Sequence, residues 1–253
     1  MNVVGLQTII RREIERFLRT YVQSLLSPWV SALLYILVFG VIVGKRIELI
    51  DGVQYIDFVL PGIVMLNIIT ASFSHTSFSL YFMRFTRHIE EILVAPLSYL
   101  EMVIGFVVGG VVRGLVTGVG VYIIAIIFSA ATIAHFGLFI FYAVAVAIIF
   151  SLFGLIVSLW ADNFEHLSVF NTFVIMPLTF LGGVFNSIHM LPEKAQAFVR
   201  WNPFFYFVDG LRYSMIGVRE ASASVGVIMI MLLILALGAI VWHLFRIGWR
   251  IRS

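Results

Sequence analysis

Six long apolar runs that hold almost no charge dominate this sequence and decide what it can fold into. A hydrophobic stretch of about 20 residues is long enough to cross the hydrocarbon core of a bilayer as an α-helix. The sequence therefore predicts an all-α, polytopic membrane protein with six transmembrane helices. The predicted spans are Leu25 to Gly44, Phe58 to Met83, Met102 to Phe128, Phe136 to Ala161, Leu167 to Phe185 and Val225 to Phe245.

The composition excludes other classes of protein. With 62% hydrophobic and 11% charged residues, the chain cannot be a soluble globule. Strands of a membrane β-barrel alternate polar and apolar residues, which these runs do not. The net charge of +3 comes from basic residues that are dispersed beside apolar runs, so we expect no nucleic-acid partner and assign the basic excess to the membrane.

The distribution of basic residues predicts the orientation. An even number of spans places both termini on one side of the membrane. With the termini inside, nine Lys and Arg residues, Arg252 among them, fall in cytoplasmic segments, and six, including Lys45 and Arg46, fall outside. Cytoplasmic segments of membrane proteins carry the basic excess. We therefore expect both termini to be cytoplasmic.

Two amphipathic segments lie outside the spans on the predicted cytoplasmic side. Residues 1–24 contain an apolar helical face that predicts an interfacial helix. In residues 84–98 the apolar positions follow helical spacing and Pro96 ends the helix, which predicts a short cytoplasmic helix. The apolar face of the first segment comprises Leu6, Ile10, Ile14, Phe17, Leu18 and Tyr21, and that of the second Phe85, Ile89, Ile92 and Leu93.

Residues 186–224 interrupt the spans for longest and are too apolar for a solvated loop. Asn202 and Pro203 break the segment into two short helices, which we predict to form a re-entrant pair on the outer side. Asp209 and Arg212 are three residues apart and so can form an ion pair. We expect outer accessibility at Glu193 and Glu220, and shielding at Phe207 and Leu211.

The sequence contains none of the residue groupings that a phosphate-binding loop or a zinc protease requires. The stretch from Gly40 to Arg46 lacks the spacing and the Ser or Thr of a phosphate-binding loop, and the six histidines are scattered singly. We therefore expect a protein that is not an enzyme, with no metal site and no cofactor in this chain.

Polar groups inside the spans are the candidates for function. Arg113 is the one formal charge well inside a span, which fits either a substrate or gating contact or, as the favoured interpretation, a structural hydrogen bond. His75, Asn67 and Thr70 make the second span polar, which fits a substrate-lined face and interhelical hydrogen bonding equally. Glycines in the third span allow a neighbouring helix, favoured as one of the same chain, to approach closely. They are Gly105, Gly109, Gly110, Gly114 and Gly118.

Several runs resemble one known family. His88 to Ser98, which reads HIEEILVAPLS, is similar to the first cytoplasmic coupling segment of ABC-2 type permeases. Pro177 to Phe185, with Leu191-Pro192 and Trp201 to Pro203, resembles that family's fifth span and outer re-entrant region. The resemblance covers essentially the whole chain, 1–253, as one ABC-2 transmembrane domain. Within the family it resembles bacterial inner-membrane permeases of the YadH type, relatives of nodulation-factor and drug exporters.

The resemblance implies a multi-pass permease subunit of an ATP-binding cassette exporter in the bacterial inner membrane. Its partners would be a second permease copy, membrane lipids and a separate ATPase subunit that binds ATP and Mg²⁺. The cargo would be a lipidic, glycolipid or hydrophobic compound. The residues implied for coupling are Arg84, Arg87, Glu90, Glu91, Pro96, Arg12 and Arg16. The candidates for the substrate path are Asn67, Thr70, His75, Asn171 and Thr179, and the residues themselves offer Arg113, Asp209 and Arg212 for a gate or structural role.

Two other functions stay open at this point. A channel or secondary transporter would work without an ATPase, but it would need mid-membrane carboxylates or inverted repeats, and the sequence displays neither. A scaffold that only anchors a partner could share the amphipathic helices.

Overall fold

The computed structural model describes residues 2–251 apart from 45, 46, 48, 51 and 129–132. Lys45, Arg46 and Arg252, which entered the charge balance above, lie outside the described residues. Six helical segments are long and apolar enough to cross a membrane, which confirms the all-α fold and the six predicted spans to within a few residues at each end. These segments are Val22–Gly40, Tyr55–Phe85, Tyr99–Phe128, Phe136–Trp160, Phe164–Leu181 and Ala223–Ile247.

Four of the spans are single helices and two are composite. Spans two, three, four and six are α3 (Tyr55–Phe85), α5 (Tyr99–Phe128), α6 (Phe136–Trp160) and α11 (Ala223–Ile247). Span one combines the π-helical segments η1 (Val22–Leu26) and η2 (Ile36–Val43) with α2 (Ser27–Tyr35). Span five combines α7 (Phe164–Phe170), the π-helical η3 (Asn171–Ile175) and α8 (Met176–Leu181).

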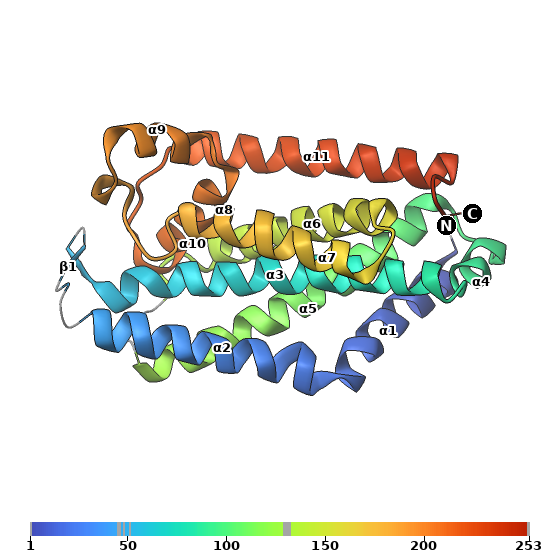
Figure 1. Ribbon diagram of the computed structural model, residues 1–253, viewed down its shortest axis with the longest axis horizontal. Coiled ribbons are helices and arrows are strands. Elements are labelled where there is room, and N and C mark those ends of the chain that lie inside the picture. The colour runs from blue at the N-terminus through green and yellow to red at the C-terminus, as the bar shows by residue number, and fades with distance from the viewer. Residues whose placement is uncertain (1, 45–46, 48, 51, 129–132, 252–253) are drawn as a thin grey trace.

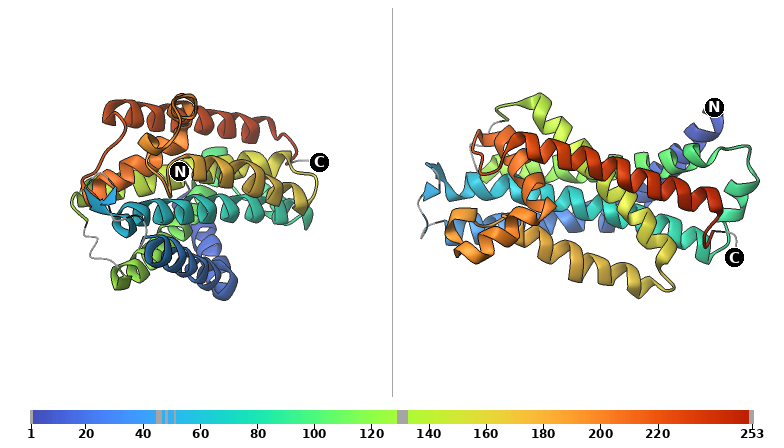
Figure 2. Two further views of the ribbon diagram at one scale, coloured as in Figure 1. Left: turned by 60° about the vertical axis from the view of Figure 1, so that its left-hand side comes forward. Right: turned by 90° about the horizontal axis from the view of Figure 1, so that it is seen from above.

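The spans run up and down along the long axis of the molecule, with α3 at the centre (Figure 1). The helices α5 and α6 pack on α3, while α11 and α2 lie on opposite sides of the bundle (Figure 2). At one end α1 (Val3–Arg19) begins, α4 (Ile89–Val94) lies and α11 ends; we call this the α4 end. At the other, the hairpin end, the strands β1 (Leu49–Ile50) and β2 (Val53–Gln54) pair antiparallel.

Glycines set the close packing around α3, α5 and α6. A Cβ at Gly109 would lie 2.6 Å from the Cβ of Glu13 on α1, and one at Gly118 would lie 2.6 Å from Ile68 Cγ1 on α3. At Gly154 on α6, a Cβ would lie 2.7 Å from the backbone oxygen of Phe73. Helices that approach this closely leave no room for side chains between them. The helices that these glycines admit belong to the same chain, as the favoured interpretation predicts.

Helix α1 buries a different face from the one that hydrophobicity predicts. Ile9, Glu13 and Phe17 are the buried residues, one helical turn apart, whereas Leu18 and Tyr21 are exposed. The prediction selects the helical face with the most apolar side chains, but the face that packs on the bundle has the carboxylate of Glu13 at its centre. The glycines of α5 accommodate this face, and α1 accordingly packs along α5.

Residues 186–224 form a one-turn helix η4 (Ile188–Met190) and the two expected helices, α9 (Glu193–Trp201) and α10 (Pro203–Ile216). Asn202 caps α10 by accepting a hydrogen bond from the Phe204 amide, which explains the break between them. Phe207 and Leu211 are buried and Glu193 is exposed, as expected. The expectation for Glu220 is wrong, because its side chain is only 1% exposed.

Replacing Gly154 by alanine tests the close packing. The new methyl group would meet the backbone of α3, which cannot move aside as a side chain can, so we expect a loss of about 1–3 kcal/mol of stability. Gly238→Ala on α11 is the matched control, because a Cβ there has nothing within 4 Å. Thermal unfolding of both variants in the same detergent measures the difference. Equal melting temperatures would contradict the packing.

Candidate functional site

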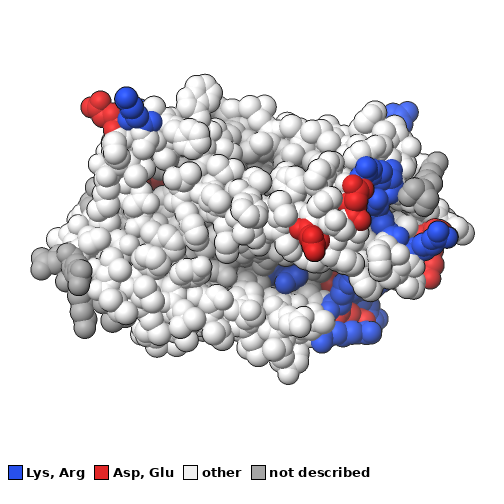
Figure 3. Space-filling view, viewed as in Figure 1, with Lys and Arg blue, Asp and Glu red and all other residues white. Residues whose placement is uncertain are grey.

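Charged groups gather at the α4 end of the molecule, while its middle is almost free of them (Figure 3). This pattern suits a bundle whose middle lies in hydrocarbon and whose α4 end lies in water and lipid headgroups. At this end α1, the last turn of α3, and α4 with its flanking turns lie together, and α11 ends there.

Helix α4 has one side that packs on the bundle and one side that is exposed. Ile89 and Ile92 are buried, whereas Glu90 and Glu91 on the other side are exposed. The helix ends at Val94, and Ala95 is extended, as the residue before a proline prefers to be. A short helix with an apolar side anchored and an acidic side free is suited to contact a partner protein.

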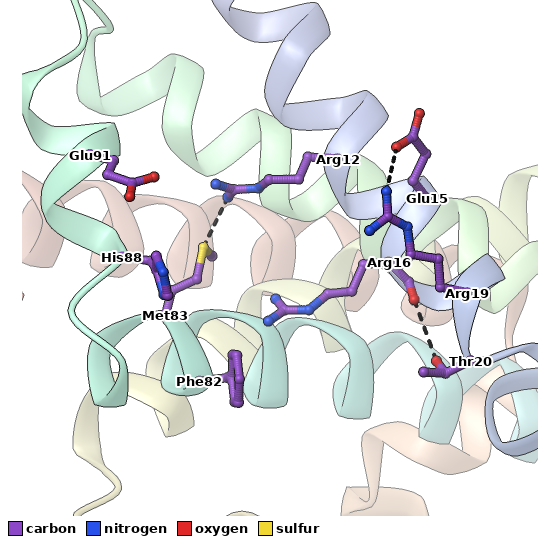
Figure 4. A pocket seen from close by; sticks show the side chains of 9 residues that line it. All are labelled: Arg12, Glu15, Arg16, Arg19, Thr20, Phe82, Met83, His88 and Glu91. Carbon is purple, nitrogen blue, oxygen red and sulfur yellow. Dashed lines mark hydrogen bonds and ion pairs between the residues drawn. The ribbon is translucent and has the colours of Figure 1, made fainter.

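A groove of about 440 Å³ separates α4 from α1 (Figure 4). Arg12, Arg16 and Arg19 line it from α1. The Arg12 guanidinium donates to the sulfur of Met83 at 2.9 Å, and Glu91 faces Arg12 across the groove. The structure therefore brings Arg12 and Arg16 together with Glu91, as a shared coupling surface requires.

The other coupling candidates divide into exposed and inward-facing residues. Arg87, Glu90 and Pro96 are exposed. Arg84 instead donates to the backbone oxygens of Ser158, at 2.5 Å, and Leu159, at 3.3 Å. These carbonyls belong to the last turn of α6, where a cation satisfies unpaired acceptors. The geometry of Arg84 is therefore that of a helix cap.

A buried polar cluster joins α1 to α3. Glu13 is fully buried and accepts a hydrogen bond of 2.5 Å from the hydroxyl of Ser79. The Nε2 atom of His75 lies 3.2 Å from Glu13 Oε2, at ion-pair distance, although its orientation makes no hydrogen bond. Arg16 donates to the Ser79 hydroxyl at 2.6 Å. The side chains of Glu13 and Arg16 from α1 and of His75 and Ser79 from α3 thus form one connected cluster.

The Glu13 carboxyl stays ionised in this cluster. Burial alone would raise its pKa, but the neighbouring His75, the hydrogen bond from Ser79 and the charge of Arg16 together lower the pKa below the ordinary value of 4.5. Glu13 is therefore a carboxylate at neutral pH and anchors α1 to the bundle.

The candidates for the substrate path occupy different surroundings. The side chains of Asn67, Thr70 and Thr179 bond to backbone oxygens of their own helices, at 2.9, 2.9 and 2.6 Å, so they have structural partners. His75 belongs to the cluster with Glu13. Asn171 lies in η3, and its Oδ1 atom is buried without a hydrogen bond from a described residue. The structure does not bring these five residues together.

The third group of candidates occupies separate places. Arg113 lies on α5 beside the cluster, and its Nε atom lacks a hydrogen-bond partner among the described residues. Arg212 is fully buried near the hairpin end, where its guanidinium lies 3.8 Å from the centre of the Phe58 ring. Arg212 forms an ion pair with Glu220, at 3.3 Å. Asp209 accepts from the backbone amides of Glu220 and Ala221.

Comparison with known proteins decides the family. Residues 4–216 match the family model described as ABC-2 type transporter. The chain belongs to the ABC-2 type transporter family. It is 36% identical to "Inner membrane transport permease YadH" of Escherichia coli K12, over 99% of this chain and 98% of the relative. It is 27% identical to "Nodulation protein J" of Rhizobium meliloti, over 82% of this chain and 79% of the relative.

The buried cluster of this ABC-2 permease contains two residues that the sequence did not single out, Glu13 and Ser79. They are 66 residues apart in the chain. One feature of the sequence could have indicated the burial of Glu13. Ile9, Glu13 and Phe17 are spaced four residues apart, so the carboxylate lies on the same helical face as two apolar residues. A charge in such a place needs a partner, and the polar second span supplies it.

Removing the Glu13 carboxylate should loosen α1 in this permease. Glu13→Ala removes the carboxylate that pairs with Arg12 and accepts a hydrogen bond from Ser79, and we expect a loss of about 3 kcal/mol of stability. Because the pKa of Glu13 is lowered, its contribution is complete above pH 4.5 and fades as the pH falls through the lowered value. Thermal unfolding at neutral and acid pH measures both effects.

Glu15→Ala is the control, because Glu15 pairs only with Arg11 and Arg19 on the exposed side of α1 among the described residues. We expect no measurable change in its melting temperature. If both variants melt at the same temperature at neutral pH, the buried cluster does not hold α1.

Proposed function

We propose that this permease is the membrane subunit of an exporter in the bacterial inner membrane. A separate ATPase subunit, which binds ATP and Mg²⁺, drives the outward movement of a lipidic, glycolipid or hydrophobic compound. The inner-membrane location is supported by the printed name of the Escherichia coli relative and by the six spans. Family membership supports an ATPase partner, because ABC-2 permeases generally work with one.

The observation that carries the proposal is the division of α4 into a buried and an exposed side. Ile89 and Ile92 hold α4 on the bundle. A force applied to Glu90 and Glu91 would therefore be passed to α3 through the short turn that joins α3 to α4. The groove beside Glu91 extends this surface to Arg12 and Arg16 on α1. Movement of a docked ATPase would thus act on two elements that lead directly into spans one and two.

A second copy of the permease completes the proposed assembly. Spans one, five and six are the least buried of the six. Spans one and five place exposed apolar side chains, such as Leu34 and Phe173, toward lipid or another subunit. We propose that two copies pair and that cargo passes between them. Membrane lipids would cover the remaining apolar surface.

Charge reversal on α4 tests the coupling surface. The double variant Glu90→Lys and Glu91→Lys should weaken ATPase co-purification at least about tenfold and uncouple ATP hydrolysis from transport, because the acidic side would then repel a complementary basic surface. Both residues are exposed, so insertion in the membrane should be unaffected. Glu193→Lys, on α9 at the opposite end, is the control for added positive charge. Unchanged coupling and unchanged co-purification in the double variant would refute this docking surface.

Cysteine labelling tests the orientation. The chain contains no cysteine, so Glu91→Cys and Glu193→Cys each introduce a single thiol. Both positions are exposed and they lie at opposite ends of the bundle. With cytoplasmic termini, an impermeant maleimide added to intact cells should label residue 193, and should label residue 91 only after permeabilisation. The reverse pattern would invert the topology.

A further inference from the structure

A second cavity, of about 450 Å³, adjoins the groove and shares Arg16, Thr20 and Phe82 with it. We call it the arginine cavity. Its walls come from five elements: α1, η1, α3, α5 and α7. Arg16, His75 and Arg113 contribute its polar groups, and Phe78, Phe82 and Phe164 contribute aromatic walls. Known ligand pockets measure about 300–1,000 Å³, so the cavity can hold a small headgroup.

One buried nitrogen donor at this cavity lacks an acceptor. Arg113 Nε is inaccessible to solvent and has no hydrogen-bond partner among the described residues. His75 lines the same cavity, but its Nε2 atom already lies 3.2 Å from Glu13 Oε2. Buried polar atoms in folded proteins are nearly always hydrogen-bonded, so the unpaired Arg113 Nε indicates a missing acceptor at the cavity.

The charges around the cavity are unbalanced. Two arginines line it, and among the described lining residues there is no carboxylate. Glu13 is in contact with His75, but it also accepts a hydrogen bond from the Ser79 hydroxyl and lies 3.4 Å from Arg12. One carboxylate cannot neutralise Arg12, Arg16 and Arg113 together. Arg16 and Arg113 are partly buried, and a guanidinium in such surroundings is unfavourable without a counter-ion, so the cavity favours an anion.

The surroundings select an anion that carries an apolar tail. Arg113 lies near the middle of α5, in a span that crosses hydrocarbon. The rings of Phe78 and Phe164 stack with their centres 6.5 Å apart, and both are partly exposed to the side of the bundle. A free inorganic ion would lose its hydration shell against these walls, whereas an alkyl chain would pack on them.

We infer that the arginine cavity binds an acidic amphiphile, with its phosphate or carboxylate headgroup between Arg16, His75 and Arg113 and its tail along Phe78, Phe82 and Phe164. The site stands on this chain alone and does not depend on the ATPase partner. Its ligand could come from the membrane, as an anionic phospholipid, or from the cargo, as a single-chain acidic compound.

Calorimetric titration of the purified full-length protein in maltoside micelles tests the site. Dodecyl phosphate is the probe, and dodecylphosphocholine, with the same tail and no net charge, is the control ligand. We expect dodecyl phosphate to bind at least about tenfold more tightly than the control ligand, because guanidinium-to-phosphate hydrogen bonds are charge-assisted. Inorganic phosphate alone should bind much more weakly than dodecyl phosphate.

Two variants test whether dodecyl phosphate binds in this cavity. Arg113→Gln removes one guanidinium and should weaken dodecyl phosphate binding about tenfold. Gln23→Glu, an exposed residue at the cavity wall, should have a similar effect by repulsion, and it remains informative if Arg113→Gln does not fold. Gln54→Glu makes the same charge change in β2 at the hairpin end and should leave binding unchanged.

Competition with phosphatidylglycerol separates the two sources of ligand. Displacement of dodecyl phosphate by phosphatidylglycerol would identify a membrane phospholipid as the occupant, and resistance would identify a single-chain acidic compound. Both results support an acidic-amphiphile site. Equal binding of the two dodecyl probes, or dodecyl phosphate binding that neither Arg113→Gln nor Gln23→Glu weakens, would overturn the inference.

Discussion

The close approach of α3, α5 and α6 is the constraint on which the rest of the structure depends. In hydrocarbon there is no hydrophobic force between apolar helices, so their association relies on contact at short range. Gly110, Gly114 and Gly154 provide that contact by removing side chains where the three helices meet. Small hydroxyl residues fill the same region, and Thr76 donates to the backbone oxygen of Ser151 on α6 at 2.9 Å. The central span α3 is the most buried of the six as a result.

The packed centre also determines where charge can be placed. Glycine at position 109 opens a notch in α5 that the Glu13 side chain fills, and this places a carboxylate next to His75. The same contact brings Arg16 toward Arg113 across the cavity between α1 and α5. Helix α1 is therefore held in the bundle by polar as well as apolar contacts. The proposed ATPase and the proposed anion would both contact α1, the former at its exposed side and the latter at the arginine cavity.

Local patterns in the sequence predict the elements of this fold well. Hydropathy gives the six spans, and Pro96 and Pro203 mark the end of α4 and the start of α10. The polar network is harder to predict, because it joins residues distant in the chain. Helical spacing indicates that Arg212 can pair with Asp209, but it gives no sign that Glu220 reaches Arg212 from beyond the end of α10. Likewise, hydrophobicity ranks Glu13 as solvent-facing, and only the glycine notch in α5 explains its burial.

The π-helical segments of spans one and five have a geometric consequence. Each π turn accommodates one more residue than an α turn, so the side chains beyond it point in directions shifted around the helix axis. In span five, η3 separates α7 from α8, and the residues on the two sides of Asn171–Ile175 follow different helical registers. A single continuous helix would present the same stripe at both membrane surfaces. Spans one and five instead present unlike faces at the two leaflets, so the outward surface of each half can be shaped independently within one span.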